Sequence, residues 1–326
     1  MNLKHAVALL ALSLCACSAS QELKPMQVQS EKEGFLTFKG RRIWYRIVGE
    51  KEAPGKLPVI CLHGGPGANS LYLKPLEQLA ASGRRVIFYD QLGCGKSDRG
   101  PDPKLMTVPS YVEELGEVRR QLGLDKVHLY GQSWGGMLAL EYYLSGGSKG
   151  IASLVLSDSL ASFEQWMSEA NRLRAELPSD VQATLKKHED AGATAEQAYQ
   201  DAMMVYYRKH LCRMNPWPDF LNESFGQVAA DVYSAMWGAS EFYATGSLMG
   251  WDVRPRLGEI KAPTLVLSGR YDESTPLVSG ELHKGIQGSQ WVIFENSAHL
   301  PHIEETERYL KVVADFLSGV EKSSAR

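Results

Sequence analysis

The chain has 326 residues, a formal net charge of −3 and a hydrophobic content of 44%. Such a composition is typical of a globular protein that can bury a large core, either as one large domain or as one domain with an insertion. The nearly balanced charge offers no basic stripe that could neutralise phosphates, so we expect no nucleic acid partner.

The first 20 residues are predicted to be a secretory signal. A positive charge near the start precedes an almost wholly apolar stretch at residues 6–14, which is too short to span a bilayer as a helix. Residues 14–17 read LCAC and look like a bacterial lipobox, in which Cys17 would carry a lipid and become the new N-terminus. Residues 21–33 are then expected to form a polar tether.

These features predict an exported protein of a bacterium, either periplasmic or a membrane-anchored lipoprotein. The lipid at Cys17 would be its only contact with a membrane. The alternative is ordinary signal cleavage near Ala19, which would release a free secreted product. The sequence does not indicate an oligomeric state.

Short apolar runs alternate with helix-like segments after residue 57. Continuous β-branched and aromatic runs suit parallel strands that are covered on both faces. We expect such strands at residues 58–62, 85–89, 126–130, 152–156, 264–267 and 291–294. Helices are expected between them, for example at residues 111–122 and 136–144. The alternation predicts an α/β fold with a mostly parallel, doubly wound sheet, and residues 35–38 and 43–48 predict an antiparallel hairpin at its front edge.

The alternation stops near Ser159 and resumes near Ala262. The interval is helix-prone and contains Trp166, Trp217 and Trp237. A gap of this length without a strand pattern is unusual inside one sheet domain. We therefore predict a helical cap at residues 159–252, inserted between two parts of the core at 34–158 and 253–320.

A candidate nucleophile lies in the sequence GQSWG at residues 131–135, which matches the pattern G-x-S-x-G. The pattern directly follows a predicted strand and directly precedes a predicted helix. That context is the strand–turn–helix elbow of the α/β-hydrolase fold, in which small residues flank a serine on a strained turn. We therefore predict that Ser133 is the nucleophile.

A serine hydroxyl needs a base, and in this fold the acid and the histidine follow the serine in that order. Asp272 lies just past the strand at 264–267, and His299 lies just past the strand at 291–294. His299 would take the proton of the serine, and Asp272 would orient its imidazole. Two alternatives remain: His302 as the base, and Asp158 as the acid or as a helix cap.

The oxyanion of the transition state needs hydrogen-bond donors. One donor would be the backbone N–H of Trp134, and the other should come from the loop after the strand at 58–62. That loop reads HGGPG at residues 63–67, and we expect Gly65 to donate, with Gly64 as the alternative. His63 is expected to brace the loop rather than to act as a second base.

Three cysteines lie in the body of the chain, so at most one disulfide can form among them: Cys61, Cys94 and Cys212. Cys61 is expected to pack in its strand. Cys94 would be a reactive thiol only if its pKa were low. No metal-ligand spacing is visible, and no cofactor is implied.

From about residue 34 to residue 317, the chain resembles the proline iminopeptidase family of serine peptidases. The matching segments are HGGPG, DQLGCGKSD, GQSWGG, WGASEF, GRYDESTP and SAH, at residues 63–67, 90–98, 131–136, 237–242, 269–276 and 297–299. The resemblance implies the catalytic set Ser133, Asp272 and His299. It also implies cleavage of an N-terminal residue, often proline, from small peptides or from amino-acid amides.

The resemblance further implies that Glu241 binds the free α-amine of the substrate. The sequence supports this, because Glu241 is the only charged residue between Asp231 and Asp252 and lies among aromatic residues. Many relatives carry a second acid where this chain has Asn215, which brings no charge. We therefore expect weaker amine binding than in those relatives, and an esterase, a lactonase or a general amidase using the same triad is the alternative function.

Overall fold

The computed structural model describes residues 31–324. The predicted signal, the proposed lipid site at Cys17 and most of the predicted tether lie outside these residues. Strand β1 (Glu31–Phe38) begins at Glu31, so residues 31–33, which the sequence analysis assigns to the tether, belong to the sheet.

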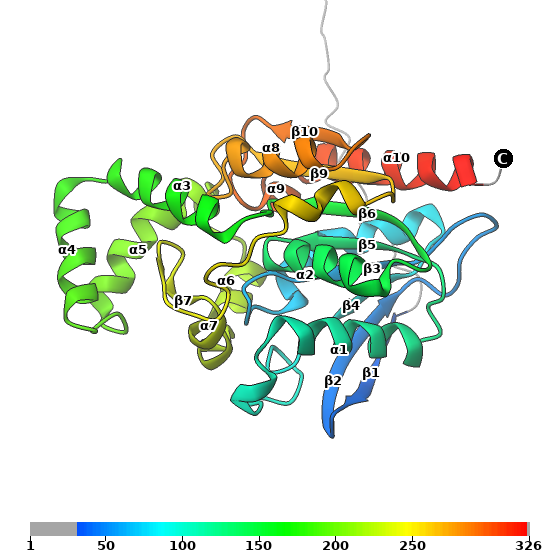
Figure 1. Ribbon diagram of the computed structural model, residues 1–326, viewed down its shortest axis with the longest axis horizontal. Helices are drawn as coiled ribbons and strands as arrows, with labels where there is room; N and C mark the ends of the chain where they lie inside the picture. Colours follow the sequence, from blue (N-terminus) through cyan, green and yellow to red (C-terminus); the bar gives the residue numbers. More distant parts are fainter. Residues whose placement is uncertain (1–30, 325–326) are drawn as a thin grey trace, which may run out of the picture.

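An eight-stranded sheet runs through the centre of the molecule (Figure 1) in the order β1-β2-β4-β3-β5-β6-β9-β10. β1 and β2 (Arg41–Val48) form the predicted hairpin, and β2 also pairs antiparallel with β4. The other pairs are parallel and join β3 (Val59–Leu62), β4 (Val86–Tyr89), β5 (Val127–Gln132), β6 (Ile151–Ser157), β9 (Thr264–Gly269) and β10 (Gln290–Phe294). The predicted fold class and its six core strands are thereby confirmed.

The strand order places a crevice at one edge of the sheet. The chain passes from β3 to β4 on one side and returns to β5 on the other side of β3. In open parallel sheets, the loops at the carboxyl ends of two such strands diverge and leave a binding crevice between them. The HGGPG loop follows β3 and the GQSWG turn lies at the end of β5, so both predicted parts of the site lie at this crevice.

Two hydrophobic cores lie on opposite faces of the sheet, because successive strand residues point to opposite sides. In β3, Val59 and Cys61 face the core under η1 (Ser70–Ser82) and α10 (Thr306–Ser324). Ile60 and Leu62 face the core under α1 (Val108–Gln121), α2 (Trp134–Tyr142) and α8 (Pro276–Gly285). Shorter helical segments complete the layers: η2 (Pro103–Leu105), η3 (Tyr143–Gly147), η4 (Arg254–Glu259) and α9 (Pro301–Glu304).

Between β6 and β9 the chain forms a separate group of helices, drawn at the left of Figure 1. It consists of α3 (Phe163–Ala175), α4 (Ser179–Asp190), α5 (Gln197–His210), α6 (Asp219–Gly226) and α7 (Ala230–Met236), followed by the short hairpin of β7 (Gly238–Ser240) and β8 (Tyr243–Ala244). We call residues 159–252 the cap. Its two ends meet, because the N–H of Phe163 donates to the carbonyl of Trp251 at 2.9 Å and Ser162 forms a bridge with Asp252.

Cys61, Cys94 and Cys212 are all buried and free. Burial raises the pKa of the Cys94 thiol well above its ordinary value. Because the thiolate is the reactive form of cysteine, the structure does not support a reactive thiol at Cys94.

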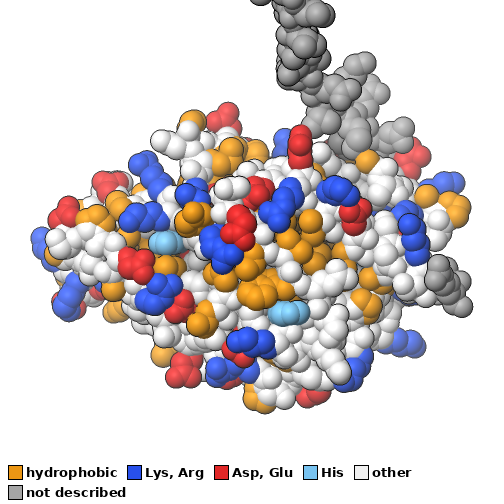
Figure 2. Space-filling view, turned by 90° about the horizontal axis from the view of Figure 1, so that it is seen from above, with side chains coloured by type: hydrophobic (Ala, Val, Ile, Leu, Met, Phe, Trp, Pro, Cys, Tyr) orange, Lys and Arg blue, Asp and Glu red, His pale blue; other side chains and the backbone are white. Residues whose placement is uncertain are grey.

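The face of the molecule seen from above in Figure 2 mixes basic, acidic and apolar side chains without a field of one charge. Within residues 31–324, no helix combines the length and the apolar character that crossing a membrane requires.

One buried ion cluster fastens the C-terminal helix to the sheet. Glu321 on α10 accepts hydrogen bonds from Arg84 at 2.8 and 3.2 Å and from the N–H of Leu57 at 2.9 Å. His128 on β5 lies 3.3 Å away. Although burial alone would raise the pKa of Glu321, its bonds with His128, Leu57 and Arg84 lower it to about 2.

We expect Glu321→Gln to lower the free energy of unfolding by about 3 kcal/mol near neutral pH, because the buried guanidinium of Arg84 would lose its counter-charge. The folded pKa lies below the ordinary value of 4.5, so this stabilisation is complete above pH 4.5 and disappears as the pH falls towards about 2. Denaturant unfolding measured across this pH range checks both statements. Glu307→Gln, at an exposed position of the same helix, is the control and should change little.

Candidate active site

Ser133 lies on a sharp turn between β5 and α2 and has φ 55° and ψ −123°. A positive φ is strained for a residue other than glycine. The turn closes because two neighbours have no side chain: a Cβ on Gly131 would collide with the carbonyl of Gly135, and a Cβ on Gly135 would collide with the carbonyl of Leu62. This is the elbow that the sequence predicts, and it presents Ser133 to a cavity.

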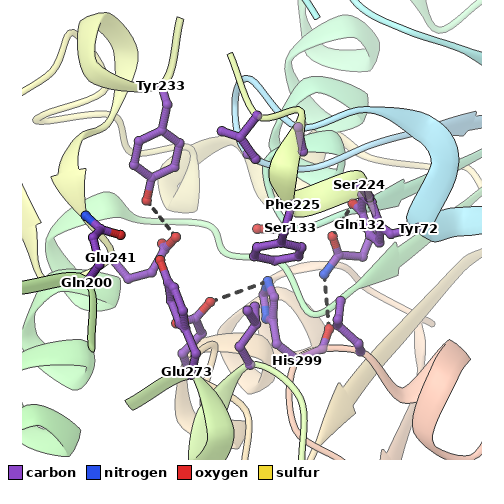
Figure 3. Close-up of a pocket in the computed structure, with 16 residues that line it drawn as sticks. Tyr72, Gln132, Ser133, Gln200, Ser224, Phe225, Tyr233, Glu241, Glu273 and His299 are labelled. Carbon is purple, nitrogen blue, oxygen red and sulfur yellow. Dashed lines mark hydrogen bonds and ion pairs between the residues drawn. The ribbon is translucent and has the colours of Figure 1, made fainter. Parts of the chain in front are cut away.

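His299 and Asp272 lie in the loops after β10 and β9 and contact each other. The Nδ1 of His299 is 2.6 Å from the Oδ1 of Asp272, which also accepts the N–H of Ser274 at 2.8 Å. Ser133 and His299 line the same cavity (Figure 3). Burial lowers the pKa of His299, which keeps its imidazole neutral and able to accept a proton.

The alternative residues are placed elsewhere. His302 is buried, donates from Nε2 to the carbonyl of Tyr72 at 3.2 Å and has a pKa that burial lowers to about 3. Asp158 accepts the N–H of Gly269 instead of a histidine N–H. It does not cap α3 either, because Ser162 holds that position.

The predicted oxyanion donors are also available. The N–H of Gly64 is engaged by the hydroxyl of Tyr72 at 2.7 Å, which removes Gly64 as the alternative. Gly65 lines the cavity, and Trp134 is the first residue of α2, where an N–H has no partner within its helix. Among residues 31–324, neither of these two N–H groups donates to another group of the chain.

A chain of hydrogen bonds joins the loops that carry these groups. The hydroxyl of Tyr72 donates to the Oε1 of Gln132 at 2.6 Å, and the Nε2 of Gln132 donates to the carbonyl of His299 at 3.1 Å. Gln132 therefore ties the histidine loop to the HGGPG loop next to Ser133 (Figure 3). His63 accepts the N–H of Gln91 at 3.0 Å and braces the same loop, as the sequence analysis expects.

The cavity has a volume of about 240 Å³ and contains two carboxyl groups. Glu241, between β7 and β8, accepts the hydroxyl of Tyr233 at 2.6 Å. Glu273 follows Asp272 directly and places its Oε1 3.8 Å from the Nε2 of His299. Burial raises the pKa of both glutamates. Figure 3 shows both side chains directed into the space beside His299.

The sequence pattern alone does not mark Glu273 as a site residue. Its position could have indicated a role, because Glu273 directly follows Asp272 in the loop after β9. Neighbouring side chains point in different directions, so one acid can face His299 from behind while the next faces the cavity. Asn215, which the resemblance places as the counterpart of a second acid, is exposed in the segment between α5 and α6 and does not line the cavity. The structure therefore does not bring Asn215 into the cavity, whereas the carboxyl group of Glu273 lies in it.

The cap is bonded to both loops that carry these side chains. The N–H of His299 donates to the carbonyl of Leu211 at 3.1 Å, and the N–H of Glu273 donates to the carbonyl of His210 at 3.1 Å. The end of α5 therefore fixes the backbone of the histidine and of the second glutamate.

Sixteen residues line the cavity, and this described set contains two glutamates and one histidine but no lysine or arginine. Between residues 31 and 324, no group of three or more His, Cys, Asp or Glu is arranged to hold a metal ion. The arrangement places a serine, a histidine with a bonded aspartate, two backbone N–H groups without partners in the described chain and two buried carboxyl groups around one cavity. It can therefore support acyl transfer from a small, positively charged substrate.

Residues 58–306 match the family described as alpha/beta hydrolase fold. The chain is 39% identical over 289 residues to a proline iminopeptidase of Clostridioides difficile (strain 630), with 88% of this chain and 98% of the relative covered. The solved proline iminopeptidase of Mycobacterium smegmatis is 36% identical, with a TM-score of 0.82 over 90% of this chain and 100% of its own. The solved structure of VinJ is 39% identical, with a TM-score of 0.85 over 89% of this chain and 99% of its own. This chain is thus a member of the proline iminopeptidase family of α/β-hydrolases.

Proposed function

We propose that this protein is a serine aminopeptidase that releases an N-terminal residue, preferably proline or a small residue, from short peptides or amino-acid amides. The observation that carries the proposal is the pair of buried carboxyl groups, Glu241 and Glu273, beside the Nε2 of His299. The proline iminopeptidases among its relatives support the same activity.

The pair fits a free α-amine at a defined place. The amine of an N-terminal residue lies two bonds from the scissile carbonyl carbon. A carboxylate 3.8 Å from the base therefore holds an ammonium close to the point of attack. Two buried carboxyl groups next to each other are stabilised by a shared cation, and an ammonium forms strong, charge-assisted hydrogen bonds with them.

In the proposed reaction, His299 removes the proton of the Ser133 hydroxyl as its oxygen attacks the carbonyl carbon. The N–H groups of Gly65 and Trp134 stabilise the oxyanion, and Asp272 stabilises the imidazolium that forms. His299 then gives the proton to the leaving amine. The acyl group remains on Ser133 until water, activated by His299, releases it.

The volume of the cavity limits the acyl side of the substrate. At about 240 Å³ it is smaller than the ~300–1,000 Å³ that drug-sized ligands occupy, so it suits one residue rather than several. An esterase or lactonase could use the same triad, but a neutral ester gains nothing from two buried carboxyl groups.

The deciding experiment uses residues 21–326 and the p-nitroanilides of proline and alanine, each with a free and with an acetylated amine. We expect turnover of the free-amine anilides alone, because the acetylated forms bring no cation to Glu241 and Glu273. Ser133→Ala should abolish this turnover, and p-nitrophenyl acetate is assayed in parallel. Equal rates with blocked amines, or turnover of the acetate ester alone, would contradict the aminopeptidase and indicate a general amidase or an esterase.

Removing one charge from the pair should weaken amine binding. We expect Glu241→Gln and Glu273→Gln each to lower kcat/KM for proline p-nitroanilide by about tenfold to a hundredfold, since one charge-assisted hydrogen bond is lost. Steady-state kinetics measures the change, and Glu164→Gln, at an exposed position of the cap, serves as the matched control. A normal kcat/KM in both active-site variants would rule out the carboxyl pair as the amine subsite.

The proposal also includes export and a lipid anchor at Cys17. Its support is the order of positive charge, apolar stretch and LCAC sequence in residues 1–17. In a bacterial host that processes lipoproteins, we expect the mature chain to start at a diacylglyceryl-modified Cys17 and to fractionate with membranes. Mass spectrometry of the N-terminal peptide tests this, and an unmodified peptide that begins near Ser20 would contradict it.

A further inference from the structure

A second aspartate lies behind the contact between Asp272 and His299. Asp158 follows the last residue of β6, is fully buried and has φ 51°, which is strained for a residue other than glycine. Its N–H donates to the carbonyl of Leu267 on β9 at 2.8 Å. Its carboxyl group lies within hydrogen-bonding reach of the carboxyl group of Asp272, and each group shifts the pKa of the other. The function proposed above gives Asp158 no part.

The other neighbours of Asp158 all donate to it. The N–H of Gly269 reaches Oδ1 at 3.1 Å, and the hydroxyl of Ser157 lies 2.5 Å from Oδ2. The Ser157 oxygen itself accepts the hydroxyl of Tyr309 at 2.7 Å, so the proton of Ser157 is directed to Asp158. The N–H of Gly269 also reaches the carboxyl group of Asp272, so the two aspartates share this one backbone donor.

Asp272, in contrast, has one carboxyl oxygen that lacks a donor. Its Oδ1 accepts from His299 and from the N–H of Ser274, whereas its Oδ2 is buried and has no hydrogen-bond partner among the described residues. Two ionised carboxylates in contact repel each other, and a buried pair of this kind holds one proton. The proton satisfies both groups when it lies on Asp158, because Asp272 already accepts from two donors, one of which is a histidine that becomes cationic.

We propose that Asp158 is a neutral carboxylic acid whose hydroxyl donates a hydrogen bond to the Oδ2 of Asp272. This bond fixes the rotation of the Asp272 carboxylate, so that Oδ1 stays directed at the Nδ1 of His299. Asp158 is then a positioning residue that acts on the reaction through Asp272. The proposal rests on Ser133, Asp272 and His299 acting together and does not depend on which acyl substrate the protein cleaves.

The surroundings favour the neutral form. Burial, followed by the charge of Asp272, raises the pKa of Asp158 well above its ordinary value. The other titratable groups near the pair include the imidazole of His299, the carboxyl groups of Glu304 and Glu273, and buried tyrosines, among them Tyr72, Tyr130 and Tyr309. The tyrosines have raised pKa values and remain neutral hydroxyl groups.

The test compares Asp158→Asn, which keeps a neutral donor, with Asp158→Ala, which leaves the Oδ2 of Asp272 without one. We expect Asp158→Ala to lower kcat by about tenfold to a hundredfold with little change in KM, and Asp158→Asn to recover most of that loss. The acid limb of the pH profile should not move in Asp158→Asn, because no charge is removed. Asp180→Asn, at an exposed position of the cap, is the matched control.

Infrared difference spectroscopy provides a readout that needs neither substrate nor the alanine variant. The spectrum of the wild type minus that of Asp158→Asn should contain a carbonyl band of a protonated, buried carboxyl group, since other buried carboxyl groups contribute equally to both spectra. Kinetics is measured with whichever anilide or ester the wild type hydrolyses, so a failure of the aminopeptidase assignment leaves this test intact.

Three results would overturn the proposal. The first is an unchanged kcat in Asp158→Ala. The second is a loss in Asp158→Asn as large as in Asp158→Ala, with the acid limb moved to lower pH, because an ionised Asp158 would raise the pKa of His299 and its removal would lower it. The third is a difference spectrum between the wild type and Asp158→Asn that contains no protonated carboxyl band.

Discussion

The site depends on three backbone segments that pack without side chains between them. Ser133 keeps its positive φ because Gly131 and Gly135 allow the end of β5, the start of α2 and the end of β3 to touch. A strained conformation of this kind costs about 1–3 kcal/mol and persists only where the surrounding structure holds it. The same contact sets the distance between the nucleophile and the HGGPG loop. The positions of the oxyanion donors relative to Ser133 are therefore set by backbone packing, and the surrounding side chains only reinforce them.

Charge is the second organising feature. Four buried carboxyl groups surround one imidazole, and burial raises the pKa of all four while it lowers that of His299. Asp158 and Asp272 lie on the Nδ1 side of the ring, and Glu273 lies on the Nε2 side. The first pair serves the histidine, whereas Glu273 and Glu241 face the substrate. The imidazole of His299 thus lies between two acidic pairs. Groups of the protein stabilise the charge of Asp272, whereas the amine of the substrate is expected to stabilise the charge of Glu273 and Glu241.

The strands and the nucleophile turn could be predicted because their signals are local. A buried strand has a continuous apolar run, and the GQSWG turn needs glycines at fixed offsets from Ser133. The order of Asp272 and His299 followed from their positions at strand ends. Glu273 could not be distinguished in the same way, because the direction of its side chain depends on the path of the loop after β9 and on the bond to His210. Asn215 was placed by resemblance in a segment whose position depends on the packing of the cap. The pairing of Asp158 with Asp272 requires β6 and β9 to be neighbours in the sheet, which no local pattern encodes.

The attachment of the cap bears on how molecules of different size reach the site. The cap joins the sheet where Ser162 meets Asp252, and its carbonyls at His210 and Leu211 hold the backbones of Glu273 and His299. A cap that swung away as a lid would break those bonds and dismantle the catalytic centre as it opened. Because the catalytic groups stay in place only while these bonds hold, we expect substrate to reach the cavity with the cap in its present position. Under this constraint the interior segments of a folded protein could not enter the cavity, whereas the free end of a short chain could.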